Sequence, residues 1–211
     1  MKTMGFINSH KENENRIALL PCHMKELGKA AGYLFFEQGY GRKLGISDRE
    51  YEEMGASVAP RGEILHKCNI ICDPKAGDAE YLGELREGTT VFGWVHPHVD
   101  PDMKALLLER KLKVYAWEEM LENNTQIFYR NNILAGQASV IHGCLSYGML
   151  MEGKKAAVLG RGNTAAGDAI YLSRICKKVY LVHRRDKLRA TAIYHKRLED
   201  LPNLEFVWNA V

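Results

Sequence analysis

A glycine-rich turn between an apolar strand and a helix constrains this chain more than any other feature. The turn reads Gly160-Arg161-Gly162-Asn163-Thr164-Ala165, with the spacing G-x-G-x-x-A, and it follows the apolar run 156–159 directly. In a dinucleotide-binding βαβ unit, the first glycine permits the tight turn and the second lets the backbone approach a pyrophosphate. The small third residue lets the helix pack on the strand. The turn therefore predicts a dinucleotide site, and the alternative is a merely tight strand–helix turn.

The next expected strand, 178–183, ends in a cluster of basic residues. His183, Arg184 and Arg185 stand where NAD sites usually carry an acidic residue for the ribose 2′-hydroxyl, and Arg189 follows shortly after. Guanidinium groups suit a 2′-phosphate instead, because their forked donors bind phosphate bidentately. The cluster therefore predicts NADP as the cofactor. The alternative is a solvated basic loop in which Asp186 pairs with one of the arginines.

Strand and helix patterns alternate along the whole chain. In the first section, strands are expected over 4–7, 33–37, 69–72, 90–95 and 113–117, and helices after Pro21 and over 47–54, 80–86 and 102–110. In the second, a long helix is expected over 134–151, strands over 156–159, 178–183 and 204–208, and helices over 168–175 and 190–198. This order predicts an α/β fold of doubly wound parallel sheets.

Two domains are expected from the break in pattern near Arg130. Residues 1–130 form a substrate domain, and residues 131–211 form a linking helix and a Rossmann-type dinucleotide-binding domain. The segment from Lys154 onward is long enough for one three-stranded half of such a fold. We therefore expect the dinucleotide-binding domain to be incomplete.

Composition excludes several classes of protein. The 211 residues carry 29 basic and 26 acidic side chains, and the formal net charge of +3 is too balanced to indicate a nucleic-acid partner. No apolar run is long enough for a transmembrane helix, and the N-terminal segment lacks the apolar core of a signal peptide. The five cysteines include no C-x-x-C pair and indicate free thiols in a reducing compartment. We expect a cytoplasmic protein with no membrane partner and no metal site.

Three polar residues near strand ends are candidate substrate ligands. Arg16 adjoins the apolar run 17–20, Lys75 lies in a Pro/Gly loop after one expected strand, and His96 follows another. Open α/β sheets place ligands at the carboxyl ends of their strands. Together these side chains could bind a carboxylate and a carbonyl and supply one titrating group. Taken singly, a His or Lys near a loop is usually a surface or capping residue, and on spacing alone His98 is as well placed as His96.

The motifs around these residues resemble the alanine dehydrogenase and transhydrogenase family. The opening motif comprises Lys11-Glu12 and Glu14-Asn15-Arg16-Ile17-Ala18-Leu19-Leu20-Pro21, and the order that follows is Gly39-Tyr40-Gly41, Ser47-Asp48, Tyr51 and Gly55-Ala56. Within the family, five segments look most like the carboxyethyl-ornithine synthases: 73–78, 92–96, 116–118, 130–132 and 159–165. The resemblance covers about residues 1–165.

This resemblance implies an NADP-dependent oxidoreductase with small-molecule substrates. In these synthases, pyruvate and the side-chain amine of ornithine condense to an imine, which NADPH reduces. The resemblance implies that Arg16 and Lys75 hold the 2-oxo acid and that His96 is the acid/base. We also expect a homo-oligomer. The amine substrate stays open between ornithine and a similar amino acid.

The tail departs from this family. Segments 169–174, 179–190 and 204–209 resemble the NADPH-binding domain of thioredoxin reductases, yet the chain has neither a C-x-x-C pair nor an N-terminal flavin-binding glycine motif. Thioredoxin reductase activity is therefore not expected. In the alanine dehydrogenase family, an acidic residue beyond this point helps catalysis, so we expect a truncated relative. Two alternatives stay open: reductive amination of the alanine dehydrogenase type with ammonia, and an NADP-binding fragment without turnover.

Overall fold

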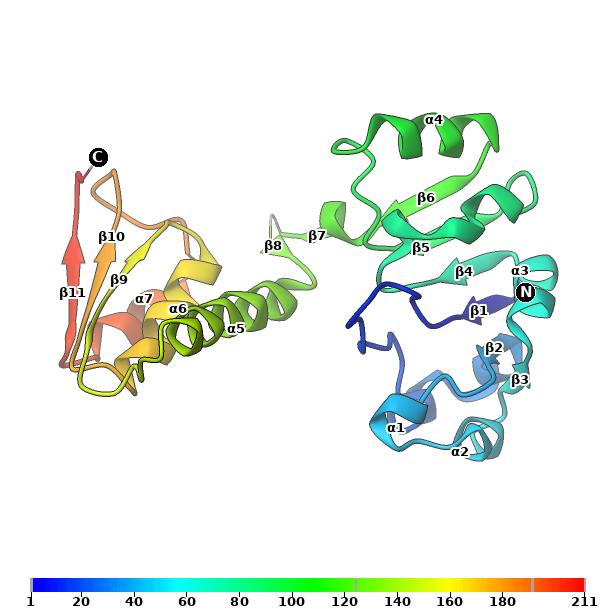
Figure 1. Ribbon diagram of the computed structural model, residues 1–211, viewed down its shortest axis with the longest axis horizontal. Coiled ribbons are helices and arrows are strands. Elements are labelled where there is room, and N and C mark those ends of the chain that lie inside the picture. The colour runs from blue at the N-terminus through cyan, green and yellow to red at the C-terminus, as the bar shows by residue number, and fades with distance from the viewer. Residues whose placement is uncertain (1, 124, 191, 211) are drawn as a thin grey trace. The chain divides into compact units, whose positions relative to one another are not determined.

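The computed structural model describes residues 2–123, 125–190 and 192–210, and it divides into two compact units, Met1–Leu121 and Glu122–Val211. Each unit has a parallel sheet (Figure 1), and each has a hydrophobic core of its own. Within the described residues, no helix is both long enough and apolar enough to cross a membrane.

The first unit is built on a six-stranded sheet with strand order β3-β2-β1-β4-β5-β6. The strands are β1 (Met4–Phe6), β2 (Leu34–Glu37), β3 (Ser57–Ala59), β4 (Ile70–Cys72), β5 (Thr90–Gly93) and β6 (Lys113–Ala116), and every pairing is parallel. The chain moves outward from β1 to β3 on one side and from β4 to β6 on the other. The order therefore reverses between β1 and β4, which is the topological switch point where doubly wound sheets bind ligands.

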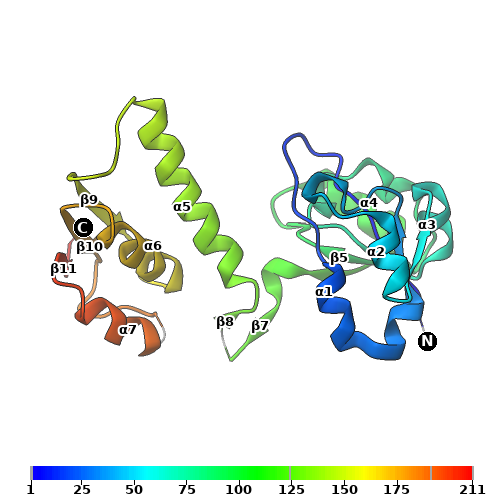
Figure 2. The same cartoon turned by 90° about the horizontal axis from the view of Figure 1, so that it is seen from below.

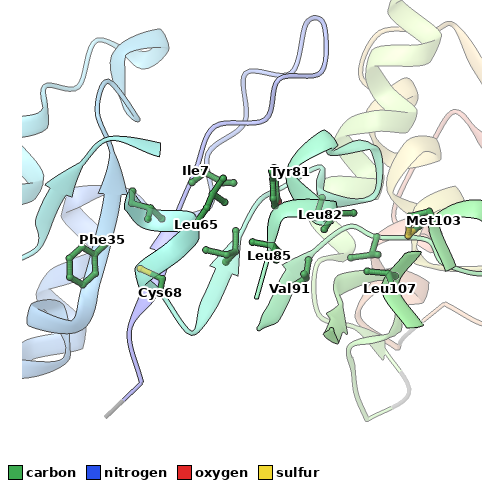
Figure 3. Close-up of a cluster of buried hydrophobic side chains, with 14 of the residues drawn as sticks. Ile7, Phe35, Leu65, Cys68, Tyr81, Leu82, Leu85, Val91, Met103 and Leu107 are labelled. Atoms are coloured by element: carbon green, nitrogen blue, oxygen red, sulfur yellow. The ribbon is translucent and has the colours of Figure 1, made fainter. Parts of the chain in front are cut away.

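Helices and turns cover both faces of this sheet, as two neighbouring residues of β2 show. Phe35 joins a core with α3 (Arg61–Lys67) and α4 (Pro101–Glu109), part of which is drawn in Figure 3. Phe36 points to the opposite face, and its ring centroid lies 4.2 Å from that of Tyr51 on α2 (Asp48–Glu53). Successive strand residues face opposite sides, so β2 is covered on both. The predicted α/β fold with a doubly wound parallel sheet is confirmed.

Several local predictions for the first unit were wrong. The patterns missed β3 and α3, which are short and lack a clear alternation. The helix expected after Pro21 is a single α-turn, α1 (Pro21–Met24), followed by a 3₁₀ segment over Lys25–Tyr33. Gly28 interrupts that segment with a φ of +52°, which glycine adopts readily. The helix expected over 80–86 is a 3₁₀ helix over Glu80–Glu84.

The second unit holds a three-stranded parallel sheet with order β11-β10-β9 (Figures 1 and 2). Its elements are α5 (Tyr129–Ser146), β9 (Lys155–Leu159), α6 (Asn163–Ser173), β10 (Lys178–Val182), α7 (Ala192–Glu199) and β11 (Leu204–Val207). A two-stranded pair, β7 (Leu121–Glu122) and β8 (Thr125–Gln126), precedes α5. The long helix ends at Ser146, earlier than the predicted 151, and Gly148 follows with a φ of +63°.

The core of the second unit lies on one face of its sheet. Val179 and Leu181 of β10 are fully buried and belong to one cluster with Ala166 and Ala169 of α6. Small residues on α6 let the helix lie close to the sheet, as expected for the helix that follows a glycine-rich turn. At the carboxyl end of β9, Leu159 is 78% exposed. This arrangement is the β-α-β-α-β half of a dinucleotide fold.

Candidate functional site

The three predicted substrate residues all lie on loops that leave the carboxyl edge of the first sheet. Arg16 belongs to the loop after β1, Lys75 to the loop after β4, and His96 to the loop after β5. Since β1, β4 and β5 are consecutive in the sheet, the three loops emerge at and beside the switch point.

The loop after β4 is held against the end of β5. The N–H of Asp73 donates to the Phe92 carbonyl at 3.1 Å, and the N–H of Gly77 donates to the Trp94 carbonyl at 3.0 Å. A Cβ at position 77 would lie 2.3 Å from the Val95 carbonyl oxygen, so only glycine permits this approach. The contact brings Lys75 beside the segment that carries His96.

Lys75 and His96 line one cavity of about 630 Å³, together with residues that include Val95, Asp100 and Met103. His98 is exposed and is not among the residues that line it, although its ring contacts that of His96 at 6.1 Å between centroids. Of the two histidines, His96 is therefore the one that shares a cavity with Lys75.

Glu118 holds His96 in place from the end of β6. Its carboxylate accepts the backbone N–H of His96 and that of Val95, and it lies 3.6 Å from Nδ1 of the His96 ring. The Glu118 side chain is 10% exposed, whereas that of His96 is 41% exposed. The ring of Trp94 stacks against the imidazole at 5.9 Å between centroids. Sequence reasoning gave Glu118 no role, although an acidic residue after a strand at the same sheet edge was a usable signal.

Arg16 is held by Glu14 in a second cavity, of about 650 Å³. Glu14 accepts from Nε of Arg16 at 2.9 Å and from Nη2, and this hydrogen bonding is the main reason that the pKa of Glu14 is lowered. The positive charge of Lys75 lowers the Glu14 pKa further. The structure thus brings Lys75 and His96 into one cavity and places Arg16 in another. The charge of Lys75 reaches the carboxylate of Glu14, which holds Arg16.

Two buried tyrosines fix the segment that follows Arg16. The Tyr40 hydroxyl accepts the N–H of Ala18 at 2.7 Å, and the Tyr51 hydroxyl donates to the Leu19 carbonyl at 3.0 Å. Both rings belong to the aromatic cluster on one face of the sheet. The loop that carries Arg16 is therefore anchored directly to the core.

Asp73 is a buried carboxyl group beside this site that the sequence did not single out. It is 1% exposed and accepts the Tyr81 hydroxyl at 3.1 Å and the N–H of Lys75 at 2.7 Å. Burial raises the pKa of Asp73, and the two hydrogen bonds oppose that rise. The side chain supports the backbone that presents Lys75.

In the second unit, the glycine-rich turn has the geometry that a pyrophosphate needs. The N–H of Gly160 donates to the Val182 carbonyl at 3.1 Å, and a Cβ on Gly160 would lie 2.5 Å from the Cβ of Ala165. A Cβ on Gly162 would meet open space, so no other atoms occupy the side of the backbone where that Cβ would lie. Helix α6 begins at Asn163, and its first N–H groups provide a positive end for an anion.

The basic strand end adjoins this turn. His183 is 5% exposed, donates its N–H to the Val207 carbonyl at 2.9 Å, and contacts the Trp208 ring at 6.4 Å between centroids. A cavity of about 510 Å³ is lined by Leu159, Gly160, Arg161, Val182, His183, Arg184 and Ala210. Within the described residues, no ion pair joins Asp186 to an arginine.

These features fit a dinucleotide. Gly160 has no room for a side chain, and open space lies beside Gly162. Helix α6 begins directly after the turn, and a cavity lined by basic side chains adjoins it. In the parts of the chain that the structure describes, no group of three or more His, Cys, Asp or Glu residues is placed to hold a metal ion. Fold and site together define an α/β protein in which a doubly wound unit is followed by half of a dinucleotide-binding fold.

Residues 6–140 match the model of the family "Alanine dehydrogenase/PNT, N-terminal domain", and the chain belongs to this family. It is 30% identical over 200 residues to N(5)-(carboxyethyl)ornithine synthase of Clostridium botulinum, a match that covers 86% of this chain and 62% of the relative. Among solved structures, the transhydrogenase from Sinorhizobium meliloti matches 100% of this chain and 62% of its own, with a TM-score of 0.76 and 20% identity. The chain thus spans about 62% of the length of these relatives.

The second unit matches a different group as well. Residues 155–211 match the family "Pyridine nucleotide-disulphide oxidoreductase". Over 63 residues, the chain is 46% identical to thioredoxin reductase of Borreliella burgdorferi, which covers 30% of this chain and 19% of the relative. The predicted resemblance of the tail is confirmed, and it supports a pyridine-nucleotide site at the glycine-rich turn.

Proposed function

We propose that this chain binds NADP and a 2-oxo acid, and that it belongs to an oxidoreductase which reduces the imine formed between pyruvate and the side-chain amine of ornithine. The observation that carries the proposal is the cavity shared by Lys75 and His96 at the sheet edge. The similarity to N(5)-(carboxyethyl)ornithine synthase extends over both units and supports the proposed imine reduction.

The side chains of the first unit suit a 2-oxo acid. The guanidinium of Arg16 offers donors for a carboxylate, and the ammonium of Lys75 can polarise a carbonyl oxygen. Since Glu118 approaches Nδ1 of His96, the Nε2 atom is left to transfer protons. In this proposal Nε2 protonates the oxygen that leaves as water when the imine forms. When bound, the cofactor supplies the hydride that reduces the carbon–nitrogen double bond.

The second unit supplies the preference for NADP in this proposal. Arg184, Arg185 and Arg189 follow β10 in place of an acidic residue, and a 2′-phosphate carries close to two negative charges at neutral pH. NADH offers only a hydroxyl at that position. We therefore expect NADPH to bind at least about a hundredfold more tightly than NADH, since each guanidinium–phosphate bond contributes about 1.5–3 kcal/mol.

A fluorescence titration tests the cofactor proposal, because Trp208 lies beside His183 and can report binding. The double substitution Arg184→Ala and Arg185→Ala should bring the two affinities closer together, by weakening NADPH binding rather than by improving NADH binding. The preference should also shrink with added salt. Equal affinity for NADPH and NADH in the unchanged chain would leave these arginines as a solvated loop and would remove the NADP proposal.

An NADPH-oxidation assay with pyruvate and an amine tests the reaction. Oxidation with ornithine, but not with lysine or ammonia, supports the synthase reaction. Oxidation with ammonia supports the alternative, reductive amination of the alanine dehydrogenase type, which family membership favours. Tight NADPH binding without turnover for any amine would mean that the chain by itself is a binding fragment.

A further inference from the structure

Arg161, the middle residue of the G-R-G turn, lies beside the loop that follows β10. The N–H of Arg189 donates to the carbonyl oxygen of Arg161 at 2.7 Å, so one hydrogen bond ties the two loops together. Leu188 and Ala190 on either side of Arg189 are buried, which fixes this part of the loop in the core. The residue between the two glycines is therefore positioned against the basic cluster.

Four guanidinium groups gather at this end of the second sheet. The pKa of Arg161 is lowered chiefly by the positive charge of Arg189, with further contributions from desolvation and from Arg184 and Arg185. Like charges repel, so each of these groups raises the free energy of the charged form of the others. Within the described residues, no carboxylate forms an ion pair with any of these four arginines. An anion held among them would relieve this repulsion.

Two of these four arginines line the same cavity beside the turn. Arg161 comes from the glycine-rich turn and Arg184 from the end of β10, and both line the cavity of about 510 Å³. The remaining lining residues of this cavity carry no acidic side chain. An anion there would be approached from the turn on one side and from the strand end on the other.

We propose that Arg161 is a specificity-determining residue that binds the 2′-phosphate of NADP together with Arg184, Arg185 and Arg189. This inference rests on the proposed NADP preference and deepens it, because it assigns selectivity to a residue of the turn. Glycine-rich turns of this kind approach the pyrophosphate, which NAD and NADP share. The Arg161 guanidinium, directed from that loop toward Arg189, would instead contact the 2′-phosphate, which NADP has and NAD lacks.

The test uses two adenosine nucleotides that differ only in the relevant group, adenosine 2′,5′-bisphosphate and 5′-AMP. Each is titrated against the whole chain by calorimetry, at low and at moderate salt. Arg161→Gln should lower the affinity for the bisphosphate about tenfold and change the affinity for 5′-AMP by less than about twofold, because only a charge-assisted bond to the 2′-phosphate is lost. Arg161→Lys should recover part of the loss, since an ammonium keeps the charge without the fork.

A matched control removes the same charge at a distance from the turn. Arg174 is exposed at the C-terminal end of α6, whereas Arg161 precedes the N-terminal end of that helix. Arg174→Gln should leave both affinities unchanged. If Arg174→Gln weakens binding of the bisphosphate as much as Arg161→Gln does, the affinity depends on the overall charge and not on a contact from Arg161. That result would overturn the inference.

The outcomes separate this inference from the proposed function. If the unchanged chain binds both nucleotides equally, the NADP preference itself fails, and the role of Arg161 fails with it. If the unchanged chain prefers the bisphosphate and Arg161→Gln keeps that preference, the NADP proposal stands and the role of Arg161 is overturned. If Arg161→Gln weakens both nucleotides alike, the side chain binds the 5′-phosphate, and the inference is likewise overturned.

Discussion

Glu118, at the end of β6, accepts the backbone N–H of His96, and its carboxylate also lies 3.6 Å from Nδ1 of the same residue. The backbone of His96 has a φ of +52°, in the left-handed region that is costly for a residue with a side chain. One carboxylate therefore fixes both the backbone and the ring of the histidine that we place in the acid/base role.

Replacing Glu118 by Gln should separate positioning from binding. The amide keeps the size of the side chain and one acceptor oxygen, but it removes the charge beside Nδ1. We expect kcat to fall by about tenfold to a hundredfold, because a misplaced catalytic group costs rate. KM for pyruvate should stay nearly constant. Glu119→Gln, at the exposed neighbour, is the matched control, and a change confined to KM would contradict the positioning role.

The two histidines of the loop after β5 should differ in their effect on turnover. His96 lines the cavity with Lys75, whereas His98 does not. His96→Asn should lower kcat by about 10²–10⁴, the usual contribution of a general acid/base, and His98→Asn should do far less. Steady-state kinetics of both variants decide between them. Equal effects would mean that the wrong histidine was chosen or that neither takes part in chemistry.

Arg16→Lys should lower the affinity for pyruvate about tenfold or more, because a lysine cannot form the second hydrogen bond of a bidentate contact. NADPH affinity should not change, since the cofactor cavity lies within the second unit. Arg49→Lys is a suitable control, because Arg49 pairs with Glu53 on the exposed side of α2. Unchanged pyruvate binding in Arg16→Lys would remove Arg16 from the site.

Asp73 should make the stability of the first unit depend on pH. Burial raises its pKa in the folded state above the ordinary value of 3.8. A raised pKa means that the folded chain holds this proton more tightly, so its contribution to stability is lost as the pH rises through the folded pKa.

Asp73→Asn should therefore gain stability relative to the unchanged chain as the pH rises from that ordinary value toward neutrality. Urea unfolding at several pH values measures the difference. Glu52→Gln, at an exposed carboxylate of α2, should show no such trend. A difference that stays constant with pH would contradict the raised pKa.

The two glycines of the turn should respond differently to alanine. In Gly160→Ala, the new methyl group meets Ala165 at 2.5 Å, so we expect a loss of about 1–3 kcal/mol in the free energy of unfolding. In Gly162→Ala, the methyl group enters open space, so stability should hold while NADPH binding weakens. Thermal unfolding and NADPH titration of both variants measure this. Equal destabilisation by the two would be inconsistent with the turn geometry.

The sequence by itself determined the features that depend on residues adjacent along the chain. The apolar runs and the turn residues between them predicted the parallel α/β fold, and the spacing of Gly160, Gly162 and Ala165 predicted the turn that α6 follows. These features are local, because a strand–turn–helix unit is specified by the conformations that its own residues allow.

Only the tertiary structure decided which strand ends are neighbours. It placed Glu118 under His96, Gly77 against Val95, and Arg161 beside Arg189. It also showed β3 and α3, which the local sequence patterns had missed. The physical reason is that strand order in a parallel sheet follows from the packing of crossover helices on its faces. Contacts between loops at the sheet edge follow from that order and from no local pattern.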